Sequence, residues 1–249
     1  MMTKEQKLQK IEKLYNLYKS GKLGGDIMPE DSNPHLDIDS KENFLYFTLP
    51  MALNYQRNSY TLWESAKKTY EDSTTCFIFD PKKVISASYE DIQAALIKYR
   101  LALQKDKQTQ IWIKLCYTIE TLLNGDIRNI FKICDYDVDK IRDYMQKQHK
   151  KDFPYLSGNK LCNYWMYVIY QYTNIRYINK EDLTIAPDIH VLRSSVKLEI
   201  ITQKEFESSN AQIICIQNWN EILKSTKFAP IDIHTPLWLW GRSGFKENL

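Results

Sequence analysis

Glycine is scarce in this sequence, with 7 residues in 249, and proline contributes only 8. Neither G-x-G-x-x-G nor G-x-x-x-x-G-K-[ST] occurs, which excludes the glycine-rich phosphate loops of the common nucleotide-binding folds. The shortage of turn residues also disfavours an all-β sandwich, whose short strands need many turns. The remaining composition, 43% hydrophobic and 26% charged, is that of an ordinary globular protein.

Clustered cysteines and long hydrophobic runs are also missing. The five cysteines include no C-x-x-C pair, which excludes a zinc ribbon or a clustered iron–sulfur ligand set and favours reduced thiols. No apolar run approaches the roughly 20 residues of a membrane helix, and residues 1–22 are charged throughout, unlike a signal peptide. These absences predict a cytosolic protein that is not secreted and has no membrane partner.

Apolar residues recur at helical spacing along most of the chain, as in Ile111, Leu115, Ile119 and Leu122. The pattern predicts an all-α protein of about ten helices, with a loop over 22–33 and an extended connector over 74–88. The expected helices cover residues 4–19, 41–55, 60–70, 89–103, 107–123, 126–134, 137–149, 159–173, 189–198 and 210–223, and a further short helix opens at Thr235-Pro236.

A short turn over 153–158 joins a helix that ends near His149 to a helix with Lys160 in its first turn. Exposed backbone N–H groups at such a helix start can hold a phosphate. A lysine there opposes the helix dipole, and local conflicts of this kind are commoner at functional sites. Lys160 is therefore a candidate nucleophile, because a lysine amine can form a Schiff base.

A second signal follows at Pro187-Asp188-Ile189-His190, where another helix is expected to begin. Asp188 is the natural N-cap, since its carboxylate can accept backbone N–H bonds. A carboxylate held in this way can stabilise an oxocarbenium-like sugar or guide a nucleophile.

On these residues the chain resembles the helix-hairpin-helix superfamily of DNA glycosylases. The family pattern is roughly L-P-G-V-G-x-K-T-A, then an apolar helix, then V-D-T-H-[IV]-x-R. Here Gly158-Asn159-Lys160 matches the second hairpin glycine, its neighbour and the catalytic lysine of the bifunctional members. The segment from Asp188 to Arg193 matches D-x-H-V-x-R, so that Asp188 falls on the catalytic aspartate.

The match departs from the family pattern at three points. Leu156 replaces the first hairpin glycine, the connector from the lysine helix to Asp188 is longer than in endonuclease III-like members, and the iron–sulfur cysteine motif is absent. The longer connector and missing cluster are more similar to the archaeal 8-oxoguanine glycosylase branch. The resemblance thus implies a DNA N-glycosylase with AP (β-) lyase activity in base excision repair, acting on an oxidised base, with 8-oxoguanine expected.

The resemblance also implies two helical subdomains with the active-site cleft between them. Residues 1–40 would form an N-terminal helix and loop that pack with the C-terminal segment, and residues 41–150 a helical barrel. Residues 151–198 would carry the hairpin and catalytic segment, and residues 199–249 would complete the other subdomain.

The same resemblance assigns roles to single residues. Lys160 would attack the sugar while Asp188 stabilises its positive charge, with no cofactor or metal. The partner would be double-stranded DNA containing a damaged base, bound by a monomer that is cytoplasmic (nucleoid-associated) or nuclear. Phosphate contacts are expected from Ser157, Gly158, Asn159, Lys147, Lys150 and Lys151, and the wedge or base pocket from Gln56, Asn54, Asn163 and Trp238.

Several other interpretations stay open at this point. Asp188-Ile189-His190 recurs as Asp232-Ile233-His234, and two D-x-H units could supply a metal site of a hydrolase, although both also suit helix starts. Trp238 and Trp240, with Phe245, could simply pack the C-terminal segment. A net charge of +3 is compatible with nucleic acid without indicating it. The alternatives to a DNA glycosylase are a queuosine-salvage type nucleotide N-glycosidase and a non-catalytic DNA-binding helix-hairpin-helix protein.

Overall fold

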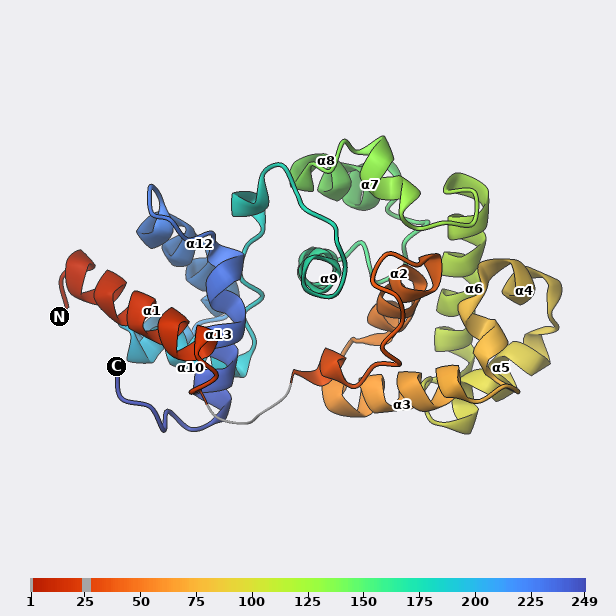
Figure 1. Ribbon diagram of the computed structural model, residues 1–249, viewed down its shortest axis with the longest axis horizontal. Helices are drawn as coiled ribbons and strands as arrows, with labels where there is room; N and C mark the ends of the chain where they lie inside the picture. The colour runs from red at the N-terminus through yellow and green to blue at the C-terminus, as the bar shows by residue number, and fades with distance from the viewer. Residues whose placement is uncertain (1, 24–27) are drawn as a thin grey trace. The chain divides into compact units, whose positions relative to one another are not determined.

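The computed structural model describes residues 2–23 and 28–249, and every regular element in that part of the chain is a helix (Figure 1). The all-α class predicted from the sequence is therefore confirmed. Residues 24–27 of the predicted 22–33 loop, and residue 1, lie outside the described residues. Among the helices that the structure describes, none is long and apolar enough to cross a membrane.

The regular elements are mostly short, and helices of about one to five turns follow each other closely. The α-helices are α1 (Lys4–Lys19), α2 (Lys41–Thr48), α3 (Ser59–Glu71), α4 (Pro81–Ser86), α5 (Tyr89–Lys98), α6 (Lys105–Leu122), α7 (Asn129–Ile133), α8 (Val138–Asp143), α9 (Asn159–Tyr172), α10 (Ile189–Lys197), α11 (Gln203–Phe206), α12 (Ala211–Leu223) and α13 (Pro230–Arg242). Between them lie the 3₁₀ helices η1 (Pro29–Asp31), η2 (Pro50–Leu53), η3 (Cys76–Phe79) and η5 (Lys180–Asp182), and the π-helix η4 (Tyr144–Gln148).

The chain divides into two compact units. Unit one combines the N-terminal segment with Asn179–Leu249, and unit two is Met28–Ile178. Unit one therefore holds α1 and α10–α13, whereas α2–α9 belong to unit two. Because the chain leaves unit one after α1 and returns to it at Asn179, unit two is an insertion between two segments of unit one.

Unit two is built around α9, which contacts α2 and α8 and is seen end-on in Figure 1. Leu161, Trp165 and Val168 lie at positions i, i+4 and i+7 of α9 and are all buried. The Trp165 ring stacks on Phe131 of α7, with 5.6 Å between ring centroids. This packing fixes α9 in unit two, and with it the helix start that carries Lys160.

Unit one is built around α13, which contacts α1, α10 and α12. Nearly all residues of α13 are buried. The start of α10 approaches α13 at Gly241, where an added Cβ would lie only 2.5 Å from the carbonyl oxygen of His190. The absence of a side chain at this position thus allows the two helices to pack closely where α10 begins.

The segment 74–88 corrects the sequence prediction, because it contains η3 and α4 in place of an extended connector. Asp80 caps α4, since its Oδ1 accepts the Lys82 amide at 3.0 Å, and Pro81 occupies the first helical position. Only Pro81 and Val84 of this six-residue helix are buried. A helix this short shows no helical period in its sequence.

The last helix also differs from its prediction, because α13 begins at Pro230 and not at Thr235-Pro236. The Asp232 carboxylate accepts the Ala229 amide at 3.0 Å and closes the first turn. Pro236 lies inside the helix, where its missing N–H leaves one backbone bond unmade. The predicted helix over 41–55 is likewise shorter, since Pro50 opens the separate turn η2.

Candidate functional site

The turn over 153–158 joins η4 to α9 as predicted, and Gly158 is the N-cap residue of α9. The Ser157 amide donates to the Phe153 carbonyl and the Gly158 amide to the Tyr155 carbonyl, both at 2.9 Å. These two amides are therefore occupied within the turn. The amides that the helix start leaves without a carbonyl or side-chain acceptor among the described residues are those of positions 159, 160 and 161.

Several lysines lie near this turn, and they differ in whether an acidic side chain pairs with them. Lys160 is exposed at the second position of α9, and Lys150 and Lys151 are exposed before the turn. Among the described residues these three form no ion pair. Lys147 instead binds the Asp143 carboxylate at 2.7 Å, and this hydrogen bond raises the pKa of Lys147. The structure thus provides three uncompensated positive charges at the helix start, with Lys147 already engaged by a carboxylate.

The loop that carries Gln56 lies beside the same turn. The ring of Tyr55, which is 51% exposed, lies 5.3 Å from the ring of Tyr155 in the turn. Lys107 Nζ lies 5.2 Å from the centre of the Tyr155 ring. Gln56 itself is exposed and has a left-handed backbone, with φ of 51°. The wedge candidate Gln56 and the turn before Lys160 are therefore neighbours in unit two.

Sequence reasoning missed Tyr55, Tyr155 and Lys107, although all three contribute to this surface. They are separated by about 50 residues each in the chain, a distance at which no helical or strand period links them. The left-handed backbone of Tyr155, with φ of 60°, is equally absent from any sequence pattern. The only available signal was the unusual tyrosine content, 17 residues in 249.

The two asparagines of the predicted base pocket are engaged in hydrogen bonds. Asn54 Oδ1 accepts the hydroxyl of Ser59, the first residue of α3, at 3.1 Å. Asn163 is 5% exposed on α9, and its Oδ1 accepts from Arg142 of α8 at 3.5 Å. Both amides therefore contribute to the packing of unit two.

Asp188 lies in unit one and caps α10 as predicted. Its Oδ1 accepts the backbone N–H groups of His190 and Val191, at 2.9 Å and 3.0 Å. Its Oδ2 accepts the indole N–H of Trp238 at 2.8 Å. Asp188 is half-buried, and its carboxylate is held by three donors. Lys160 belongs to the other unit.

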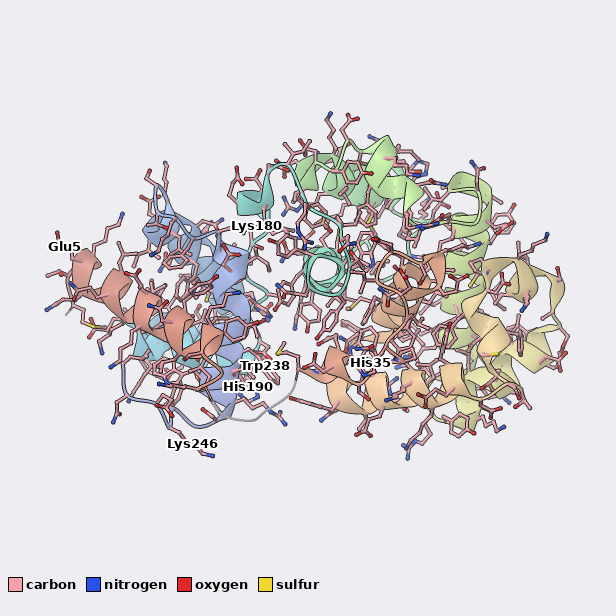
Figure 2. All side chains as sticks on the ribbon, viewed as in Figure 1. Glu5, His35, Lys180, His190, Trp238 and Lys246 are labelled. Atoms are coloured by element: carbon pink, nitrogen blue, oxygen red, sulfur yellow. The ribbon has the colours of Figure 1, made fainter. Side chains whose placement is uncertain are left out.

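Trp238 packs against the start of α10, and Figure 2 shows it beside His190. The two ring centroids are 5.7 Å apart in an edge-to-face arrangement. The guanidinium group of Arg242 lies 5.2 Å from the Trp238 ring. Trp240, in contrast, donates its indole N–H to the Glu247 carbonyl at 2.8 Å and packs the C-terminal segment.

The second D-x-H unit has structural partners. The Asp232 carboxylate binds Lys180 Nζ at 2.8 Å and 3.1 Å. The buried His234 accepts the Ala186 amide through Nδ1 at 3.4 Å. In residues 2–23 and 28–249, no group of three His, Cys, Asp or Glu side chains is placed to hold a metal ion. The recurrence of D-x-H is therefore explained by helix starts and packing in unit one.

Glu30 is a titratable residue in unit two that sequence reasoning missed. Its carboxyl is 1% exposed, and Oε1 accepts the Trp63 indole N–H at 2.9 Å and the Tyr164 hydroxyl at 2.8 Å. Burial raises the pKa of Glu30 from its ordinary 4.5 to about 7. The sequence around Glu30 contains Pro29 and Asp31, and it indicated only a loop.

Comparison with known proteins adds no assignment to this geometry. No model of a known protein family matches the chain. No curated protein matches it in sequence either. The function is therefore inferred from the residues and contacts described above.

Proposed function

We propose that this protein is a DNA N-glycosylase with β-lyase activity, which uses Lys160 as nucleophile and Asp188 as the carboxylate that stabilises positive charge. One observation carries the proposal. An exposed lysine lies in the first turn of α9 directly after the hairpin turn, and the next α-helix begins with an aspartate whose two oxygens are held by three donors. This is the pair of groups that Schiff-base chemistry at a sugar carbon requires.

In the proposed reaction the lesion nucleotide is extruded from the duplex, so that C1′ becomes accessible. The amine of Lys160 bonds to C1′ as the glycosidic C1′–N bond breaks, and the base leaves with the bonding electrons and takes up a proton. The nitrogen of Lys160 then forms a double bond to C1′ as the C1′–O4′ bond breaks, and a proton released from the amine passes to O4′, which gives a Schiff base. β-Elimination removes a proton from C2′ and breaks the C3′–O bond, so that the 3′ phosphate leaves with the bonding electrons. Asp188 stabilises the positive charge that develops on the sugar.

DNA would be held through its phosphates at the start of α9. The amides of residues 159–161 and the uncompensated charges of Lys150 and Lys151 support this proposal. The exposed Tyr55 ring and the adjoining Gln56 would contact bases next to the extruded nucleotide, because aromatic faces stack on bases. An oxidised purine, with 8-oxoguanine first, is the proposed lesion, and Trp238 is a proposed wall of its pocket.

Borohydride trapping on a duplex with one abasic site tests the proposal directly. Wild-type protein should become covalently linked to the DNA. Lys160→Gln should keep DNA affinity and lose all trapping. Lys82→Gln is the matched control, since Lys82 is also exposed at the second position of a helix in unit two. Undiminished trapping by Lys160→Gln, or equal loss in Lys82→Gln, would contradict the proposed nucleophile.

A panel of duplexes with single lesions identifies the substrate. Excision of 8-oxoguanine is the expected result, whereas excision of thymine glycol or uracil alone would refute the substrate and leave the mechanism intact. Base release from a free modified nucleotide without trapping would indicate the nucleotide N-glycosidase. DNA binding with neither trapping nor base release would indicate the non-catalytic binding protein.

A further inference from the structure

One face of α13 packs against the start of α10. His234, Trp238 and Gly241 lie at positions i, i+4 and i+7, which share one side of a helix. His234 binds the amide of Ala186, just before Asp188, and Gly241 lies against the His190 carbonyl. Between these two contacts, Trp238 reaches the Asp188 carboxylate itself. The helix thus contacts the chain on both sides of Asp188 and also contacts its side chain.

The three hydrogen bonds on Asp188 divide unequally between its oxygens. Both cap bonds end on Oδ1, which fixes that atom but leaves the carboxylate plane free to turn about it. The indole bond of Trp238 ends on Oδ2 at 2.8 Å, within the normal range for a hydrogen bond to a charged acceptor. Capping α10 uses only Oδ1. The hydrogen bond from the Trp238 indole to Oδ2 is therefore not explained by helix capping.

We propose that Trp238 is a positioning residue that fixes the carboxylate plane of Asp188 for the sugar chemistry, an inference that rests on the proposed glycosylase function. A carboxylate already oriented toward a developing positive charge stabilises it without reorganising, which is the general advantage of preorganised electrostatics. Without the indole N–H, Asp188 still caps α10 but samples several orientations. The loss should therefore fall on the rate of base excision and not on DNA binding.

The Trp238 ring is itself well held, which makes a clean substitution feasible. It is 8% exposed, lies edge-to-face with His190, and lies under the Arg242 guanidinium. Phenylalanine can retain much of this ring packing while it removes the N–H donor. Trp240→Phe is the matched control, because Trp240 is 3% exposed on the same helix and its indole N–H donates to the Glu247 carbonyl.

The contact itself can be tested without any activity. The six tryptophans give a small set of indole N–H signals in a ¹H–¹⁵N spectrum, and loss of one signal in Trp238→Phe identifies Trp238. Asp188→Asn has one side-chain oxygen instead of two, so it cannot keep both the cap and the indole bond as found. The Trp238 signal should therefore move in Asp188→Asn, and an unmoved signal would overturn the proposal.

The consequence is tested by single-turnover excision and by DNA affinity. Trp238→Phe should slow excision about 10- to 100-fold with the Kd for an abasic duplex unchanged within about 2-fold, while Trp240→Phe slows excision by less than about 3-fold. An equal effect of both variants would overturn the positioning role while the glycosylase function stands. Absence of excision and trapping in the wild-type protein would overturn the glycosylase function and, with it, the role of Trp238.

Discussion

Glu30 carries a carboxyl group that folding removes from water almost completely. Desolvation disfavours the charged form and raises the pKa of Glu30 to about 7, against the opposing effect of its hydrogen bonds from Tyr164 and Trp63. The neighbouring Asp31 raises it further. Folding therefore favours the protonated carboxyl, which links the stability of unit two to pH.

This linkage gives a prediction for Glu30→Gln. Because the folded-state pKa exceeds the unfolded value of 4.5, the folded protein binds the proton more tightly, and the wild type loses stability as pH rises from 4.5 to 7. The glutamine amide oxygen can accept the same two bonds and carries no charge. Glu30→Gln should therefore gain stability relative to wild type on going from pH 4.5 to pH 8, by on the order of 2–3 kcal/mol. Urea unfolding at a series of pH values measures the difference.

Glu42→Gln, at an exposed carboxyl of α2 in the same unit, is the control for removing one negative charge. A stability difference between Glu30→Gln and wild type that stays constant between pH 4.5 and pH 8 would show that Glu30 is not preferentially protonated in the folded state.

The roles of single residues could be predicted from the sequence where they depend only on residues nearby in the chain. Asp188 was predicted as a cap because the sequence Pro187-Asp188 indicates a helix start by itself, and the structure confirms the cap. The partner of its second oxygen, Trp238, lies 50 residues away, and no periodicity links the two. Glu30 was missed for the same reason, since its burial depends on Trp63 and Tyr164 from distant helices.

At the scale of elements, the segment from η4 to the turn before α9 carries two kinds of lysine. Lys150 and Lys151 are exposed and form no ion pair with any described residue, whereas Lys147 binds Asp143. Only uncompensated lysines are free to replace the counterions that surround the phosphates of a duplex. Lys150 and Lys151 are therefore the lysines available to bind DNA phosphates, whereas the charge of Lys147 is already compensated by Asp143.

The salt dependence of duplex binding tests this difference between Lys147 and the pair Lys150 and Lys151. The slope of log K against log salt concentration becomes shallower by about 0.9 for each phosphate that the protein no longer neutralises. The double variant Lys150→Gln, Lys151→Gln should therefore lower the slope by about 1–2, while Lys147→Gln leaves it nearly unchanged. Titrations at several salt concentrations measure the slopes. Equal slopes for wild type and the double variant would exclude Lys150 and Lys151 from the DNA interface.

Whole elements were predictable where their apolar face is long enough to show a period. α1, α9, α10 and α12 begin and end within a residue or two of the predicted ranges. The prediction for the segment 74–88 was wrong because α4 has six residues. The predicted start of α13 was wrong because Pro236, a residue type that usually opens a helix, here lies inside one that is buried on nearly every side.

On the scale of the molecule, unit two has a continuous chain and its own core, which includes the fully buried Trp63, Trp112 and Trp165. Unit one is formed from two separate segments of the chain, and its core includes side chains of its first helix. Ile11 and Leu14 of α1 are completely buried, and α1 contacts α13. Lys227, which lies between α12 and α13, pairs with Glu12 of α1.

Fragments of the chain should therefore behave differently. Residues 28–178 expressed alone should give a helical protein that unfolds cooperatively, because a contiguous domain with its own core can fold by itself. Residues 179–249 alone should lack a cooperative transition, and addition of a peptide of residues 1–23 should increase their helicity. Circular dichroism and thermal unfolding measure both outcomes. A cooperative transition in residues 179–249 alone would show that α1 is dispensable.

The insertion of unit two within unit one sets an order during translation. At roughly 5–20 residues per second, α1 leaves the ribosome many seconds before α13. During that interval the face of α1 that is buried in the folded protein has no native partner and is accessible to chaperones. The lysine of α9 is likewise synthesised before the aspartate of α10 and the tryptophan that binds it. A polypeptide released early would thus carry the amine without the carboxylate, so that truncation products lack half of the proposed chemistry from the outset.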